Sequence, residues 1–143
     1  MVLNILIGLA TMAVCLMLQS VLIVLALRYY AKRENFDAAP SPWQVFLLLN
    51  AVMSLLVIGN LAQLFVWALL FLLLGEFASL DVAVYHSAVN FASLGYGDIV
   101  MSERHRLLGA LEAINGVLMI GVSTAALMAT LQDAYRQSGK RPG

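Results

Sequence analysis

Three long apolar runs constrain this chain more than any other feature of its sequence. Residues 1–27 and residues 43–74 carry no charged side chain, and residues 107–131 carry one, Glu112. A helix rises about 1.5 Å per residue, so each run is long enough to cross a hydrocarbon core about 30 Å thick. The sequence therefore predicts an all-α membrane protein with three membrane-spanning helices.

The composition agrees with this class and excludes others. Of the 143 residues, 62% are hydrophobic and 11% are charged, and the mean hydropathy is +0.90. A soluble domain carries about 25% charged residues. The net charge is zero and no basic run is present, which argues against nucleic-acid binding. The single cysteine, Cys15, has no partner for an intrachain disulfide and is expected to be a packing residue.

The first apolar run could be either a membrane-spanning helix or a secretory signal peptide. A signal peptide has a basic start, a shorter apolar core and a cleavage site of small residues. Here the start is uncharged, the run is longer, and Arg28, Lys32 and Arg33 come after it. These features favour a helix that remains in the membrane.

The basic residues predict the orientation in the membrane. Six of the eight lie in the segments 28–42 and 134–143, whereas the segment 75–106 holds only Arg104 and Arg106. Short loops rich in Lys and Arg face the cytoplasm. We expect a cytoplasmic loop at 28–42, a short cytoplasmic tail at 134–143, and the N-terminus and the segment 75–106 outside. The small size suggests a prokaryotic inner membrane.

The segment between the second and third runs contains a short helix followed by glycines. Residues 81–91, "DVAVYHSAVNF", predict a helix too short to cross the membrane, with Asp81 favourable at its N-terminus. The stretch "SLGYGD" at 93–98 follows directly. Non-helical backbone at membrane depth is tolerated only inside protein or beside a watery cavity. The helix is therefore expected to be re-entrant and to end at such a cavity.

The stretch at 93–98 resembles the selectivity filter of the potassium channel superfamily, usually written TVGYGD. The layout of the chain also resembles that family's pore module over residues 43–133, with an outer helix 43–74, a pore helix 81–91, a filter 93–98 and an inner helix 107–131. The first helix lies outside the resemblance. The resemblance implies a homotetramer in lipid around a central pore, with K⁺ as the permeant ligand and no cofactor.

The resemblance also implies roles for the filter residues. Potassium leaves water where rings of backbone carbonyls replace its hydration shell. The carbonyls expected to bind K⁺ are those of Ser93, Leu94, Gly95 and Tyr96, and the filter also includes Gly97. The two glycines supply backbone angles that other residues resist. Asp98 is expected at the pore mouth, where its charge concentrates cations.

Two departures from the family's filter leave the selectivity open. Ser93 stands for threonine and Leu94 for valine, and neither change removes a coordinating oxygen. The function predicted from these features is passive, potassium-selective conduction. The alternatives are a nonselective cation channel and a membrane subunit that does not conduct. An enzyme is disfavoured, because the sequence shows neither clustered metal ligands nor a nucleophile with a placed base.

Several further residues have two interpretations each. Gly116 and Gly121 in the last run either form a gating hinge or allow close helix packing. Glu112 either braces the filter from behind or lies at a wet interface. His86 or Tyr85 either contacts the Tyr96 hydroxyl of the same or a neighbouring chain or packs at the interface. The polar residues of the second run are expected to join helices, namely Asn50, Asn60 and Gln63.

Overall fold

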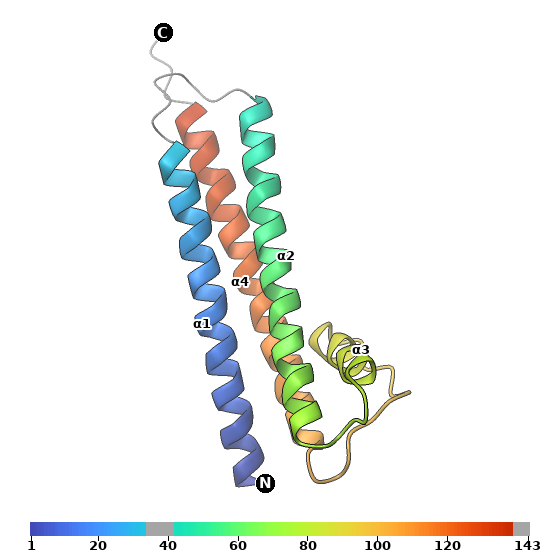
Figure 1. Ribbon diagram of the computed structural model, residues 1–143. Coiled ribbons are helices and arrows are strands. Elements are labelled where there is room, and N and C mark those ends of the chain that lie inside the picture. The colour runs from blue at the N-terminus through green and yellow to red at the C-terminus, as the bar shows by residue number, and fades with distance from the viewer. Residues whose placement is uncertain (34–41, 139–143) are drawn as a thin grey trace.

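The computed structural model describes residues 1–33 and 42–138 and contains four helices there (Figure 1). These are α1 (Val2–Arg33), α2 (Pro42–Leu73), α3 (Leu80–Phe91) and α4 (Arg106–Ser138). No strand occurs among these residues. Three helices are long and apolar enough to span a membrane, over Val2–Ala26, Trp43–Leu73 and Arg106–Gln132. The predicted all-α membrane fold with three spanning helices is confirmed.

Two helices continue further than the sequence predicted. Helix α1 was expected to end at residue 27 and runs on to Arg33, so residues 28–33 are helical and not loop. Helix α4 was expected to end at residue 131 and runs on to Ser138. Loss of hydropathy marks where a helix leaves the lipid, but polar residues with good helix propensity continue the helix beyond that point. The rest of the predicted loop and tail, residues 34–41 and 139–143, lies outside the described residues.

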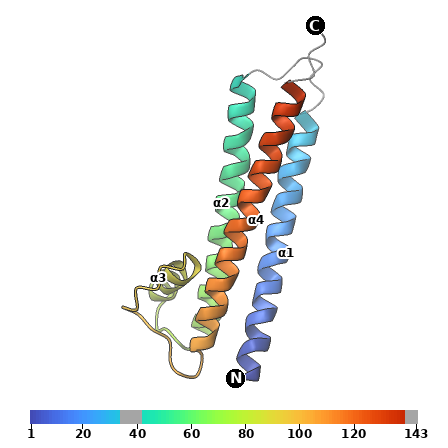
Figure 2. The same ribbon diagram turned by 180° about the vertical axis from the view of Figure 1, so that it is seen from behind.

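The three long helices run side by side, and α3 lies against one end of them (Figures 1 and 2). Helix α1 contacts α2 and α4, while α3 contacts α2 and α4 but not α1. Helix α2 begins at Pro42, since proline at the first helical position has its backbone already set for a helix and lacks only an N–H that would be unpaired. The loop after α3 projects away from the bundle on the side opposite α1.

A buried cluster holds the short helix to the bundle. Trp67 and Phe71 of α2 are fully buried, with ring centroids 5.9 Å apart. The ring of Phe71 also makes an edge contact with His86 of α3 at 5.7 Å. Cys15 of α1 is fully buried in the same cluster, which confirms its packing role. Large buried aromatic rings contribute much of a core's burial energy, so this cluster fixes the place of α3.

A network of amide groups joins α1 to the other two long helices. The side-chain nitrogen of Gln63 donates to the side-chain oxygen of Gln19 at 2.8 Å, and both residues are buried. Gln19 in turn donates to the hydroxyl of Ser123 at 3.0 Å. Asn60 also donates to that hydroxyl, at 3.4 Å. Asn60 and Gln63 therefore join helices as predicted. Asn50 does not, because it is exposed and donates to the Phe46 carbonyl of its own helix.

Candidate ion pathway

Helix α3 ends in a hydrogen-bonded cap that shapes the start of the predicted filter. The N–H of Ser93 donates to the Asn90 carbonyl at 2.8 Å, and the N–H of Leu94 donates to the Val89 carbonyl, also at 2.8 Å. This pair of bonds is the Schellman motif, which needs a left-handed residue just past the helix end. Ser93 takes that conformation, with φ of 57°.

The cap gives a physical reason for serine at this position. A β-branched residue in the left-handed region is strained more than serine, because a second atom on Cβ crowds the backbone. Threonine, which usually stands at this position in the filter that the stretch resembles, would be strained in place of Ser93. This cap was not predicted from the sequence, since the motif usually has glycine at this position.

The glycines of the predicted filter both adopt the left-handed backbone that favours glycine. Gly95 has φ of 61° and Gly97 has φ of 73°, whereas Leu94 and Tyr96, which directly precede them, have negative φ. A Cβ at either glycine would meet no atom within 4 Å. The backbone angle, and not a shortage of space, therefore calls for glycine. Residues with positive φ therefore alternate with residues of negative φ from Ser93 to Gly97. Ion binding at these residues stays a prediction.

The filter loop is exposed over its length in the single chain. Every residue from Ala92 to Asp98 is exposed, and Leu94 and Tyr96 are 55% and 67% accessible. A hollow of about 500 Å³ lies between this loop and helices α3 and α4. Apolar side chains exposed in a contiguous patch mark an interaction surface. The loop is thus available to face either an ion path or another copy of the chain.

Tyr85 binds the residue at the predicted pore mouth. Its hydroxyl donates to a carboxylate oxygen of Asp98 at 2.7 Å. This hydrogen bond lowers the pKa of Asp98 and raises the pKa of Tyr85, so Asp98 is held in its charged form. Within one chain, Tyr85 therefore contacts Asp98 and not the Tyr96 hydroxyl.

His86 ties α3 to the segment after the filter. Its Nδ1 lies 3.1 Å from the Ile99 carbonyl oxygen, and its Nε2 lies 2.8 Å from the Asn90 amide nitrogen. An amide nitrogen only donates, so Nε2 accepts and Nδ1 carries the proton. Burial lowers the pKa of His86, which favours this neutral ring. Contact of His86 with Tyr96 of a neighbouring chain stays a prediction.

Glu112 lies inside the protein and not at a wet interface. It is fully buried on α4, facing Ser87 and Asn90 of α3. Neither carboxylate oxygen has a hydrogen-bond partner among the described residues, and the same holds for the Ser87 hydroxyl and the Asn115 amide. Buried polar groups without partners are rare and costly. The position behind the filter agrees with the bracing hypothesis, which stays a prediction.

The two candidate hinge glycines of α4 have different surroundings. A Cβ at Gly116 would lie 1.9 Å from the Phe91 carbonyl oxygen, at the end of α3. A Cβ at Gly121 would meet no atom within 4 Å. Helix α4 is continuous through both positions. Close packing therefore accounts for Gly116, whereas Gly121 remains the candidate hinge.

A polar clamp holds the turn between the filter loop and α4. Glu76, which follows α2, accepts from the backbone N–H and the hydroxyl of Ser102, both at 2.7 Å. Its carboxylate also pairs with His105. On the other side of this turn, the Asn4 amide of α1 donates to the Arg104 carbonyl. The clamp was not predicted from sequence, because its members are far apart along the chain.

The clamp is expected to weaken in acid. Burial of Glu76 acts to raise its pKa, but hydrogen bonds from Ser102 and His105 outweigh burial and lower it. A carboxyl with a lowered pKa stabilises the fold above its ordinary value of about 4.3, and this stabilisation is lost as pH falls through the lowered value. Hydrogen exchange at the Ser102 and His105 amides should keep constant protection above about pH 5. Below about pH 4, protection should fall about tenfold, as for lost hydrogen bonds to a charged group.

The Glu76→Gln variant provides the control for this titration. Its side chain has the same shape but no proton to gain, so its protection should not change across the acid range. Equal acid sensitivity in both proteins would show that another group is responsible.

Comparison with known proteins identifies a family for the pore region. A family model described as an ion channel matches residues 55–133, which is more than half of the chain. The match begins within α2, includes α3 and the filter loop, and ends within α4. No curated protein and no solved structure matches the chain.

Proposed function

The chain belongs to the ion channel family, which is not a family of enzymes, and we propose that it is the pore-forming subunit of a potassium-selective channel. The observation that carries this proposal is the backbone of the filter loop. Ser93, Gly95 and Gly97 all have positive φ, alternating with residues that do not. Such a backbone presents successive carbonyls to one side, which is the arrangement that replaces the water around K⁺.

Four copies are proposed to surround the pore. One chain contributes one filter loop, and a ring of carbonyls around an ion needs several loops. The exposed apolar side chains of Leu94, Tyr96 and Val100 support this assembly, since they have no cover within one chain. Asp98, held charged by Tyr85, would then form a ring of carboxylates at the mouth that attracts cations.

The orientation is part of the same proposal. With the segments 28–42 and 134–143, which hold six of the eight basic residues, in the cytoplasm, the N-terminus and the filter mouth face outward. The C-terminal end of α3 then points toward the middle of the membrane. A helix carries a partial negative charge at this end, which favours a cation there.

The experiment is a reversal-potential measurement on purified protein in a planar bilayer. Opposed tenfold gradients of KCl and NaCl should give a reversal near the potassium equilibrium value, about 59 mV from zero for a monovalent ion. The matched control is Gly95→Ala, since alanine resists φ of 61°. The control should assemble but carry no selective current.

The alternatives give different results in the same experiment. A wild-type reversal near zero would indicate a nonselective cation channel, in which Ser93 and Leu94 loosen the filter. Assembled wild-type protein that is silent in both bilayers and flux assays would favour a subunit that does not conduct.

A further inference from the structure

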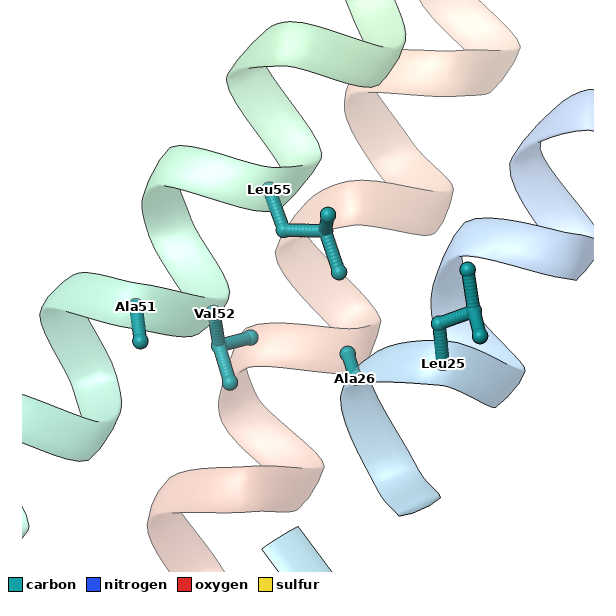
Figure 3. A pocket seen from close by; sticks show the side chains of 5 residues that line it. All are labelled: Leu25, Ala26, Ala51, Val52 and Leu55. Carbon is teal, nitrogen blue, oxygen red and sulfur yellow. The ribbon is translucent and has the colours of Figure 1, made fainter. Parts of the chain in front are cut away.

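An apolar cavity lies between α1 and α2 at the end of the bundle far from the filter. It has a volume of about 300 Å³ and is lined by Leu25 and Ala26 of α1 and by Ala51, Val52 and Leu55 of α2 (Figure 3). This volume is at the lower limit of sites that hold small ligands, about 300–1,000 Å³. Two of the lining residues are alanines, whose short side chains leave the space between the helices open.

The inner wall of the cavity belongs to the hydrophobic core. Ala26 and Val52 are buried in one cluster with Leu48 and Leu56. Ala126 and Leu127 of α4 pack against this cluster. Figure 3 shows the α4 ribbon passing behind the gap between the other two helices. The cavity is therefore a recess with a firm back wall, not a separation between independent helices.

The depth of the cavity determines what solvent it meets. All five lining residues fall within the spans of α1 and α2 that can cross a membrane. Trp43, which is 64% accessible at the start of α2, suits the membrane interface. Ala51 follows it by about 12 Å of helix, at 1.5 Å per residue. A recess at this depth faces hydrocarbon, and an apolar cavity excludes water.

A positive charge lies directly beside the recess. Arg28 is exposed and follows Leu25 by three residues, so both side chains lie on one face of α1. Lys32 and Arg33 follow in the same helix, and the nearest acidic residue in the sequence, Glu34, comes six residues after Arg28. An arginine at the edge of the hydrocarbon extends its guanidinium toward the headgroups, where it binds phosphate.

We propose that this cavity binds one acyl chain of an anionic phospholipid whose phosphate pairs with Arg28. The apolar recess binds the acyl chain, and the basic end of α1 favours a negatively charged headgroup. Since Ala126 and Leu127 pack against the cluster that includes the lining residues Ala26 and Val52, the bound lipid is separated from the helix after the filter by these two side chains. The proposed lipid site requires only that the protein spans a membrane. A failure of the proposed potassium selectivity would therefore leave this proposal unaffected.

The test is photolabelling in phosphatidylcholine vesicles that contain a small fraction of phosphatidylglycerol with a diazirine midway along one acyl chain. Peptide mapping should place the label on residues 22–28 and 48–56. The Ala51→Trp variant fills the recess, so labelling there should fall at least about fivefold, as expected when a bulky ring occupies a close-packed site. The control is Ala13→Trp, at an exposed alanine of α1 away from the cavity.

A second variant distinguishes the contribution of the lipid headgroup from that of the acyl chain. Arg28→Gln should reduce labelling by the phosphatidylglycerol probe and leave labelling by a phosphatidylcholine probe with the same diazirine unchanged. If Ala51→Trp destabilises the protein, Ala51→Leu provides a smaller filling group. The proposal is overturned if the label spreads evenly along α1 and α2, if filling does not reduce it, or if both probes label equally in the unmodified protein.

Discussion

Replacing Gly116 with alanine is expected to abolish potassium current and to prevent stable assembly. The new Cβ would lie 1.9 Å from the Phe91 carbonyl oxygen and 2.7 Å from its carbon. Both atoms belong to the backbone at the end of α3, so no side-chain rotation relieves the contact. Overpacking a core typically costs about 1–3 kcal/mol, and a contact with backbone falls at the upper end. Helix α3 must move, and the filter loop attached to it moves with it.

Gly121→Ala is the matched control for this prediction. It adds the same methyl group to the same helix, five residues further on, where no atom lies within 4 Å. Native mass spectrometry should show the proposed tetramer for the control and monomers or mixed species for Gly116→Ala. If both variants assemble and conduct equally, the close approach of α3 to α4 is not needed for the pore. If only Gly121→Ala changes gating, its role as a hinge gains support.

The spanning helices were predictable because the lipid environment imposes a simple rule. A run of apolar residues long enough to cross the membrane must be helical, since no water is present to satisfy its backbone. This rule located α2 and α4 to within one residue at the ends nearest the filter. It does not apply outside the hydrocarbon, which is why α1 and α4 continue beyond their predicted ends.

The filter region was only partly predictable. The glycines at 95 and 97 predicted positive φ from their residue type alone, because few other residues adopt it. The cap at Ser93 was missed, since serine is not a usual residue there. Whether Gly116 acts as a hinge or a packing residue depends on the distance to Phe91, and no local pattern encodes that distance.

The position of α1 was the least predictable feature. Its sequence has no motif, and Gln19 resembles any isolated polar residue in an apolar run. The structure shows that Gln19 has partners on two other helices, Gln63 and Ser123. The meeting of these side chains depends on the register of all three helices. The first helix is therefore fastened to the helix after the filter, and is not a loosely attached anchor.

Replacing Gln19 with leucine is expected to loosen α1 from the bundle. The change removes two interhelical hydrogen bonds and leaves the Gln63 amide buried without its acceptor. Interhelical hydrogen bonds in membranes contribute about 0.6–2 kcal/mol each, so the cost is about 1–4 kcal/mol per chain. Thermal unfolding in detergent should therefore begin at a lower temperature, and a cysteine pair placed across α1 and α4 should cross-link less.

The neighbouring Ser20→Ala variant distinguishes this network from a general effect of polarity. Ser20 is exposed and its hydroxyl donates to the Leu16 carbonyl of its own helix, at 2.8 Å. Its loss should change neither stability nor cross-linking. If both variants lose stability equally, helix propensity and not the network accounts for the effect. If Gln19→Leu also alters channel opening while Ser20→Ala does not, then α1 acts on the pore through Ser123, since this hydroxyl is the point where the network meets α4.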